Sequence, residues 1–265
     1  MRAGYLGPEG SYSYLAAKKM ASKGVHIAYD SFPLVFRALM QGEVDCIVIP
    51  IENSLNGEVT QNIDLMQSTP DIIATEECEV KIEHRLAILK GASADSIKCI
   101  YSHRQALDQC AKYLFENYPK AELFATPSTS ASLDMLKTEE DACIVGAHTV
   151  REGIELLDKN ISDYKDNVTH FLKVVRGTAD EDRHTKKIFF SVTCPNISGS
   201  LIKLLQRVAA HGLNMSKLQS RPIKDRTNEF RFFIEIECDY SKEEVKRAVE
   251  DIRQSALSFK MLGTY

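Results

Sequence analysis

The chain has 265 residues, of which 26% are charged and 44% hydrophobic, an ordinary composition for a globular protein and enough length for two or three domains. A formal net charge of -4 provides no basic field for nucleic acid, and no apolar run approaches the roughly 20 residues that span a bilayer. The seven cysteines form no C-x-x-C pair, so we expect reduced thiols and no metal site. The N-terminus lacks the apolar core of a signal peptide, which favours a cytoplasmic protein.

The first part of the chain repeats one pattern, in which a short apolar strand is followed by a polar turn and a helix. The pattern occurs at residues 3–21, 45–66, 98–118, 122–137 and 142–157. Strands that alternate with helices indicate parallel pairing and an α/β fold. The strand-rich stretch 76–89 is a candidate for the crossing between two lobes.

The pattern changes after residues 174–187, which are polar, rich in charge and typical of a linker. A strand at 188–195 precedes an amphipathic helix at 198–212, which ends at Gly212. Two strands at 213–223 and 228–238, joined by a polar turn, lead to a helix at 241–256 and a last strand at 258–265. The order βαββαβ is the ferredoxin-like arrangement.

Ligands of open α/β sheets bind beyond the carboxyl ends of the strands, so the residues there are candidates for a site. Hydroxyls and amides dominate these positions, which are Ser11, Tyr12, Asn53, Ser54, Ser102, His103, Gln105, Thr126, Ser128, Thr129 and Ser130. The Ser, Thr and Asn residues among them also suit a helix N-cap, Ser102 with Gln105 has the spacing of a capping box, and Gly57 suits a turn. Several helix N-termini that face one cleft would hold a small anion without a basic patch.

Thr169 and His170 stand at the start of a strand-like run, Asp166 to Val174. Both side chains can exchange protons. From the residues alone, a β-branched strand residue and a partly buried histidine are the simpler interpretation, so a catalytic role stays open at this point.

Five segments together, GPEGSYS, PIENSLNG, YSHRQALDQC, TPSTSAS and DNVTHFLKV, resemble the motif series of the prephenate dehydratase family in order and spacing. The rest resembles the ACT regulatory domain of that family, with ISGSL and LQSRP at its two signature positions. The resemblance implies a two-lobed, periplasmic-binding-protein-like catalytic part at 1–176, with a second lobe at roughly 77–158. A linker at 177–186 and a ferredoxin-like ACT domain at 187–265 would follow.

The family converts prephenate into phenylpyruvate, carbon dioxide and water in phenylalanine biosynthesis. Aromatisation supplies the driving force, so the resemblance implies a lyase that acts on a small molecule without a cofactor. Nothing helical precedes the first motif, so we expect no fused chorismate mutase. Arogenate dehydratase and a non-catalytic amino-acid sensor remain alternatives.

By the same resemblance, Thr169 carries the essential hydroxyl and Phe171 is its apolar neighbour. The implied substrate-binding residues are Ser11, Tyr12, Asn53, Ser54, Gly57, Ser102, Gln105, Ser128, Thr129, Ser130 and Phe171. His170 stands where the family has Arg, which predicts weaker substrate binding as pH rises, a proton supplied by His170 itself, or reduced activity. His84 and Arg85 are polar groups available to compensate.

The resemblance also implies an effector site for phenylalanine, between paired subunits of a dimer or a dimer of dimers. Ligand binding there would be coupled to opening or closing of the catalytic cleft. The sequence departs from the usual motifs at Ser200 and Gln219. The implied effector-binding residues are Gly199, Ser200, Leu201, Asn214, Gln219, Ser220, Arg221 and Pro222.

Overall fold

The computed structural model describes residues 1–157, 159–223 and 229–265, and it forms two compact units. The first unit consists of Met1–Val35, Val48–Val59 and Cys78–Phe171, and the second of Phe36–Ile47, Thr60–Glu77 and Leu172–Tyr265. The chain therefore passes between the units several times. The continuous domains expected from the sequence, with boundaries near residues 176 and 187, stay a prediction.

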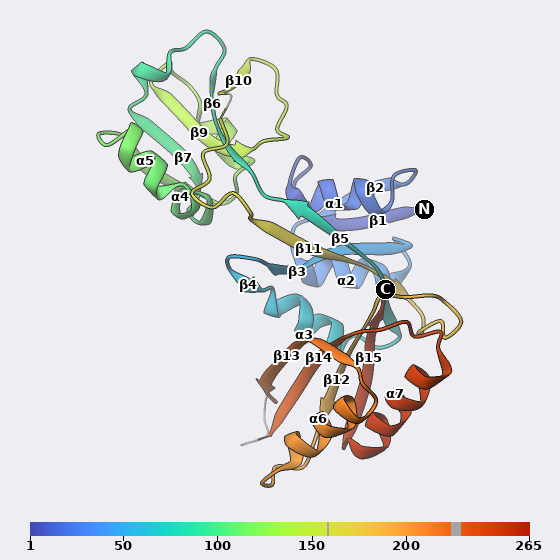
Figure 1. Ribbon diagram of the computed structural model, residues 1–265. Coiled ribbons are helices and arrows are strands. Elements are labelled where there is room, and N and C mark those ends of the chain that lie inside the picture. Colours follow the sequence, from blue (N-terminus) through green and yellow to red (C-terminus); the bar gives the residue numbers. More distant parts are fainter. Residues whose placement is uncertain (158, 224–228) are drawn as a thin grey trace. The chain divides into compact units, whose positions relative to one another are not determined.

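The helices and strands follow one another along the whole chain (Figure 1). In chain order they are β1 (Arg2–Leu6), α1 (Tyr12–Met20), β2 (Val25–Tyr29), α2 (Phe32–Gln41), β3 (Cys46–Asn53), β4 (Gly57–Glu58), α3 (Thr60–Ser68), β5 (Ile72–Lys81), β6 (His84–Leu89), η1 (Ala94–Ser96), β7 (Cys99–His103), α4 (Arg104–Gln109), α5 (Ala111–Asn117), β8 (Glu122–Thr126), η2 (Ala131–Met135), β9 (Asp141–Gly146), β10 (Ile154–Leu156), β11 (Val168–Arg176), β12 (Lys187–Thr193), α6 (Ser200–Ala210), β13 (Asn214–Pro222), β14 (Phe230–Glu237), α7 (Glu243–Ser255) and β15 (Ser258–Thr264).

Among the described residues, one sheet has ten strands, and β11, β3, β1 and β2 are neighbours in it in this order, with β1 and β2 parallel. Helix α1 connects these two strands, which is the crossover that parallel pairing requires. Ser11 caps α1, because its Oγ accepts a hydrogen bond from the Tyr14 N–H at 3.2 Å. The short strand β4 folds back on β3 as a hairpin, in which Asn53 pairs with Gly57.

The other sheet of the first unit has the order β10-β6-β9-β7-β8. Successive side chains of a strand point to opposite faces, and β9 illustrates this. Ala142 and Ile144 pack in the hydrophobic cluster that contains the α4 residue Leu107, whereas Cys143 and Val145 pack in the cluster around η2. Both faces of β9 are therefore buried, which explains its continuous apolar sequence.

Three predicted elements differ from the structure. The helix expected at the end of 142–157 is wrong, because Gly153 turns the chain at a φ of 77° and β10 pairs antiparallel with β6. The helix expected after residue 103 is divided at Cys110 into α4 and α5. The short helix expected within 122–137 is a 3-10 turn, η2. In addition, β2 and α2 were not predicted.

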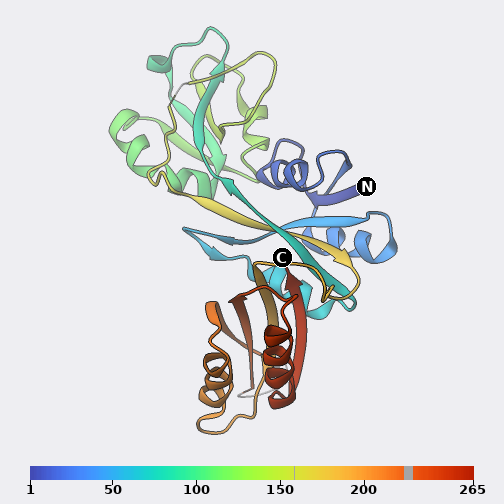
Figure 2. The same ribbon diagram turned by 45° about the vertical axis from the view of Figure 1, so that its right-hand side comes forward.

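The second unit contains the predicted order βαββαβ, as β12, α6, β13, β14, α7 and β15. Its strands lie in the order β13-β14-β12-β15, and both helices cover one face of this sheet (Figure 2). Ile188, Phe190 and Val192 on alternate positions of β12 pack with Leu204 of α6 and Val249 of α7. Each such buried side chain stabilises the fold by roughly 1.5–3 kcal/mol. The predicted turn before β14 and Asn228 lie outside the described residues, as does residue 158.

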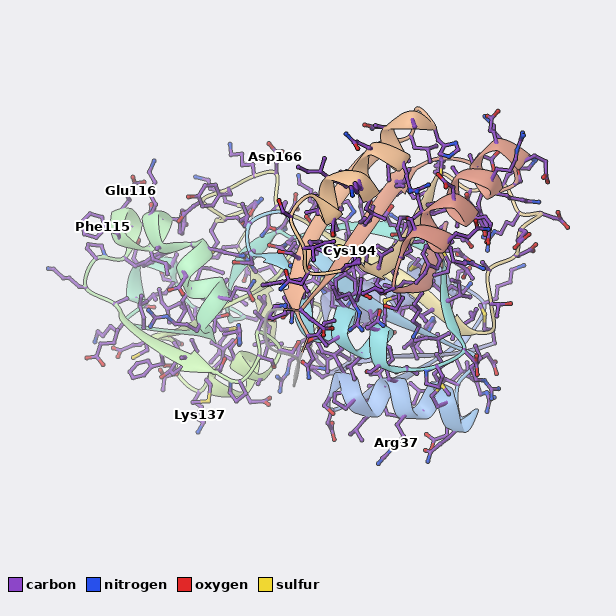
Figure 3. The ribbon with its side chains drawn as sticks, turned by 90° about the horizontal axis from the view of Figure 1, so that it is seen from below. Arg37, Phe115, Glu116, Lys137, Asp166 and Cys194 are labelled. Carbon is purple, nitrogen blue, oxygen red and sulfur yellow. The ribbon has the colours of Figure 1, made fainter. Side chains whose placement is uncertain are left out.

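The surface of the first unit exposes some apolar side chains. Phe115 is 78% exposed near the end of α5, and Figure 3 shows it with Glu116 pointing away from the helix. All seven cysteines are free, and Cys46, Cys110 and Cys143 are buried. Within the described part of the chain, each helix is too short or too polar to cross a membrane.

Candidate active site

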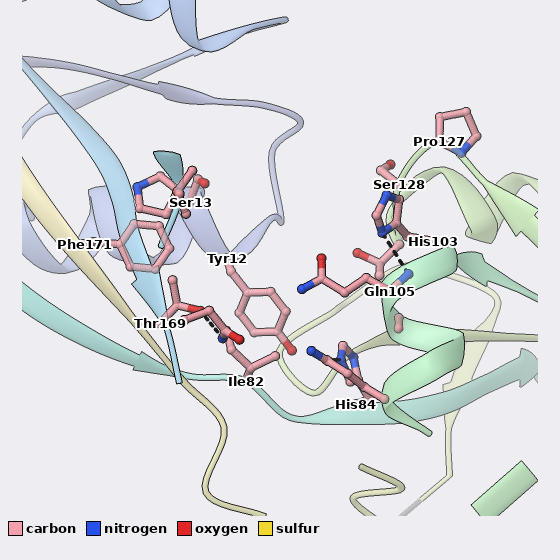
Figure 4. A pocket seen from close by; sticks show the side chains of 16 residues that line it. Tyr12, Ser13, Ile82, His84, His103, Gln105, Pro127, Ser128, Thr169 and Phe171 are labelled. Atoms are coloured by element: carbon pink, nitrogen blue, oxygen red, sulfur yellow. Dashed lines mark hydrogen bonds between the residues drawn. The ribbon is translucent and has the colours of Figure 1, made fainter. Parts of the chain in front are cut away.

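The first unit contains a pocket of about 340 Å³ (Figure 4). The beginnings of α1 and α4, the end of β3 and the start of β11 border it. Its lining residues are Tyr12, Ser13, Pro50, Asn53, Val59, Ile82, His84, His103, Gln105, Ala106, Gln109, Pro127, Ser128, Thr129, Thr169 and Phe171. None of these lining residues is Asp, Glu, Lys or Arg, so hydroxyls, amides and imidazoles give the pocket its polarity.

Thr169 lies in the pocket wall and is buried, with 9% of its surface exposed. The side-chain amide of Asn53 donates from Nδ2 to Thr169 Oγ1 at 2.9 Å. Because the threonine oxygen accepts this bond, its own hydrogen is left for another acceptor. The pocket therefore contains a hydroxyl that is held in place and able to donate a proton or a hydrogen bond (Figure 4).

His170 follows Thr169 but is not a lining residue of this pocket. Strand side chains alternate, so Thr169 and Phe171 face the pocket while His170 faces the other side of β11. There, His170 Nδ1 lies 3.9 Å from Glu79 Oε1. This placement does not support His170 as a direct proton source, and the effect of His at the usual Arg position stays a prediction.

The amide of Asn53 has a fixed orientation at the end of β3. Its Oδ1 accepts hydrogen bonds from the backbone N–H groups of Leu55 and Asn56, both at 3.1 Å, and from Asn56 Nδ2 at 2.9 Å. These three donors hold the oxygen in the turn after β3. They direct Nδ2 toward Thr169, so the hydroxyl is positioned by a local turn in a distant part of the sequence.

A chain of buried polar side chains continues from Asn53. Asn53 Nδ2 also donates to Asn167 Oδ1 at 2.7 Å, and Asn167 Nδ2 donates to Gln109 Oε1 at 3.3 Å. His84 Nε2 lies 2.9 Å from the same Gln109 oxygen. Burial lowers the pKa of His84, and its hydrogen bond to Gln109 opposes this effect only in part. A neutral imidazole therefore ends the chain.

Tyr12 lines the pocket, but its hydroxyl forms hydrogen bonds with the backbone of Glu83. The Tyr12 hydroxyl donates to the Glu83 carbonyl at 2.6 Å and accepts from the Glu83 N–H at 3.2 Å. Burial raises the pKa of Tyr12 well above its usual value, so the phenol stays neutral. Tyr12 thus ties the start of α1 to the segment before β6.

Gln105, Ser128 and Thr129 also line the pocket, and their contact with a substrate stays a prediction. Ser102 does not, because it is fully buried in β7 and its Oγ donates to the Ile144 carbonyl at 2.7 Å. The capping box expected from Ser102 and Gln105 is wrong. His103 is the N-cap of α4, and its Nδ1 accepts from the Gln105 N–H at 3.4 Å.

Four other predicted binding residues lie outside this pocket. Ser11 caps α1, and Gly57 occupies a turn at a φ of 74°. Ser54 Oγ accepts from the Val168 N–H at 3.0 Å, which holds the hairpin to the start of β11. Ser130 borders a separate pocket that also contains Ser128. Their proposed contacts with substrate stay predictions.

Sequence reasoning missed Gln109 and Asn167 and treated His84 only as a spare polar group. Gln109 is four residues after Gln105, the spacing that places two side chains on one helix face. Asn167 is two residues before Thr169, which is the period of a strand. These spacings were visible in the sequence, whereas the contact between the three side chains was not.

The predicted effector residues lie at the start of α6 and along β13. Gly199 is the N-cap of α6 at a φ of 83°, and Asn214 Nδ2 donates to Glu237 Oε2 at 2.7 Å. Gln219 and Arg221 are two residues apart on the partly buried face of β13. Gln219 Oε1 and Arg221 Nη1 are buried without a hydrogen-bond partner among the described residues.

Together, these observations define a class of protein: a mixed α/β protein with two sheets, a periplasmic-binding-protein-like fold and a pocket with hydroxyl, amide and imidazole groups in its lining. Within residues 1–157, 159–223 and 229–265, no three His, Cys, Asp or Glu side chains gather as a metal site does.

The chain belongs to the prephenate dehydratase family, because the family model described as prephenate dehydratase matches residues 3–179. It is 30% identical over 273 residues to prephenate dehydratase of Lactococcus lactis subsp. lactis, covering 100% of this chain and 97% of the relative. It is also 30% identical to the bifunctional chorismate mutase/prephenate dehydratase of Neisseria gonorrhoeae, covering 98% of this chain and 73% of the relative. The structure of prephenate dehydratase in complex with L-Phe from Arthrobacter aurescens superposes with a TM-score of 0.90 at 26% identity, covering 100% of this chain and 90% of that one.

Proposed function

We propose that this chain converts prephenate into phenylpyruvate, carbon dioxide and water in phenylalanine biosynthesis. The observation that carries the proposal is the Thr169 hydroxyl, which accepts from Asn53 and faces a pocket whose lining contains no Asp, Glu, Lys or Arg. The family membership supports a lyase with this chemistry.

The proposed reaction needs one proton at one place. The C–C bond to the departing carboxylate breaks and its electron pair enters the ring, while the C–O bond breaks and its pair leaves with the hydroxyl. The Thr169 hydroxyl protonates that leaving oxygen, so water departs. Asn53 Nδ2 stabilises the negative charge left on the threonine oxygen, which regains a proton from solvent after the reaction.

Substrate binding in this proposal depends on neutral donors. Prephenate carries two carboxylates, and the pocket offers the Gln105 amide and the Ser128 and Thr129 hydroxyls. A neutral donor is less strongly hydrated than a lysine ammonium group. It therefore loses less hydration free energy when it binds an anion in a pocket. The ring of Phe171 and the side chains of Ile82 and Val59 provide the apolar contact for the substrate ring.

The test is turnover of prephenate and, separately, of arogenate by the purified chain, with a blank that corrects for spontaneous reaction. Thr169→Ala should lower kcat by roughly 10²–10⁴-fold, because the acid is lost, and Thr169→Ser should restore part of it. His170→Arg should stay near the parent, because His170 faces away from the pocket.

Thr75→Ala is the control, since Thr75 is a strand threonine outside the pocket. A Thr169→Ala variant as fast as the parent contradicts the role of Thr169. Turnover of arogenate alone identifies an arogenate dehydratase. Turnover of neither substrate, together with binding of an amino acid, identifies a sensor.

We further propose that the βαββαβ part is an ACT domain that binds phenylalanine and regulates the enzyme as a homo-oligomer. The buried Gln219 Oε1 suits an α-ammonium group, and Arg221 Nη1 suits a carboxylate. The relative solved in complex with L-Phe supports this effector. Calorimetry with phenylalanine should detect binding that Gln219→Leu weakens, and unchanged affinity would contradict the proposed contact.

A further inference from the structure

The hydrogen bonds between the buried polar side chains of the first unit run in one donor-to-acceptor direction. Backbone N–H groups fix that direction at one end. The N–H groups of Leu55 and Asn56 both donate to Asn53 Oδ1 at 3.1 Å. A backbone N–H cannot accept, so the Asn53 oxygen must face this turn. The Asn53 nitrogen then faces the other way, toward Asn167 and Thr169.

The same reasoning carries the direction to the far end. Asn53 Nδ2 donates to Asn167 Oδ1, which leaves Asn167 Nδ2 to donate to Gln109 Oε1 at 3.3 Å. The Gln109 oxygen can only accept. His84 Nε2, 2.9 Å from this oxygen, must therefore carry a hydrogen.

We propose that His84 and Gln109 are positioning residues for the Thr169 hydroxyl: the hydrogen on His84 Nε2 holds the Gln109 and Asn167 amides in the orientation that keeps the Asn53 donor on Thr169. This inference rests on the proposed function, in which Thr169 supplies the proton. It adds two residues that the motif resemblance does not assign.

The opposite tautomer of His84 shows why the hydrogen matters. With a bare Nε2, the lone pairs of His84 and of the Gln109 oxygen face each other, so the Gln109 amide has to turn over. The Gln109 nitrogen then opposes Asn167 Nδ2, and Asn167 has to turn as well. Asn167 Nδ2 then opposes Asn53 Nδ2, which lies 2.7 Å from the present position of the Asn167 oxygen. Two donors cannot pair at that distance, so Asn53 has to shift, and its bond to Thr169 is disturbed.

The position of His84 separates a positioning role from an acid role. His84 is 3% exposed, and its Nδ1 is buried without a hydrogen-bond partner among the described residues. The titratable groups around it are Tyr12 of α1, with a ring centroid 6.4 Å away, and His148, in edge contact with Tyr12 at 4.8 Å. Glu83 precedes it on the chain, and Cys110 follows Gln109 after α4.

Protonation of His84 does not disturb the chain. A second proton would enter at Nδ1 and leave the Nε2 hydrogen on Gln109 unchanged. The positioning role is therefore independent of the charge of His84, whereas a role as general acid would disappear with the titratable proton.

Two substitutions test this difference. In His84→Gln the amide nitrogen takes the place of Nε2 and can donate to Gln109, whereas in His84→Asn it takes the place of Nδ1 and cannot reach. We expect His84→Gln to keep kcat near the parent, and His84→Asn to lower kcat up to about a hundredfold with little change in KM. His26→Gln and His26→Asn are the matched controls, because His26 lies on β2 outside the pocket.

Nuclear magnetic resonance gives a second readout that needs no turnover. A long-range ¹H–¹⁵N spectrum, assigned by the signals lost in His84→Gln, should show a protonated Nε2 and a bare Nδ1 for His84. The opposite tautomer overturns the proposal, even if the enzyme is active.

The kinetic measurements also test the positioning role of His84. Equal loss of kcat in His84→Gln and His84→Asn, with unchanged thermal unfolding, overturns positioning and favours an acid role for His84. Equal activity of both variants and the parent overturns any role. A parent that turns over neither prephenate nor arogenate instead overturns the proposed function, and the tautomer then remains a structural feature only.

Discussion

The pocket of the first unit and helix α3 of the second unit are held in place by different kinds of contact. In the pocket, neutral amides and a neutral imidazole connect His84 to Thr169. Helix α3 is held by charges. Lys260 Nζ donates to the carbonyls of Met66, Gln67 and Thr69 at 2.8, 2.9 and 2.6 Å, and the Arg221 guanidinium donates to Asp64 at 3.0 Å.

The difference has consequences for what each region can do. Hydrogen bonds between neutral groups are directional and hardly respond to salt, so they fix the orientation of the Thr169 hydroxyl. Ion pairs at partly exposed sites are weak and respond to salt and to bound charges. Because Arg221 is both a predicted effector residue and the partner of Asp64, a ligand carboxylate at Arg221 would compete with α3 for the same cation.

Of the three substitutions that test this comparison, Asn53→Asp should have the largest effect, which is on kcat. The side chain keeps its size but replaces the donor to Thr169 with an anion, so kcat should fall roughly 10²–10³-fold. The fall in kcat should be the same at low and high salt, because the hydrogen bond between Asn53 and Thr169 is buried and joins neutral groups in the parent. Steady-state kinetics would measure it, with Asn117→Asp as the control on an exposed helix end.

Lys260→Met should have an intermediate effect, on stability and not on the chemical step. The substitution leaves the last carbonyls of α3 without their shared donor, which should cost about 2–3 kcal/mol. A shift of the urea unfolding midpoint would measure this cost. Lys203→Met, on the exposed side of α6, is the matched control, and equal midpoints for the two variants would contradict the role of Lys260.

Asp64→Asn should have the smallest effect. The Arg221–Asp64 pair is partly exposed, with 25% and 43% of the two side chains accessible, so its loss should cost less than about 1 kcal/mol. The difference in the free energy of unfolding between Asp64→Asn and the parent should vanish near 1 M salt, where the screening length is about 3 Å. A difference that persists in high salt would show that the pair is not held mainly by charge.

Much of the fold was predictable because local patterns carry it. The apolar strands at 3–6 and 188–195 and the amphipathic helices at 198–212 and 241–256 have periods that the structure reproduces as β1, β12, α6 and α7. The helix expected before residue 157 failed because pairing with β6 outweighed a weak local pattern. Tertiary pairing routinely overrides such short signals.

By itself, the sequence determined the family motifs and the position of Thr169 on a strand whose alternate residues share one face. It also determined the βαββαβ order, because the spacing of apolar residues within each segment predicts whether that segment is a strand or a helix. Only the tertiary structure decided that His170 faces away from the pocket, that Ser102 is buried in β7, and that His84, Gln109, Asn167 and Asn53 form one chain. The physical reason is that hydrogen bonds between distant segments depend on which strand ends meet, and no local pattern encodes that meeting.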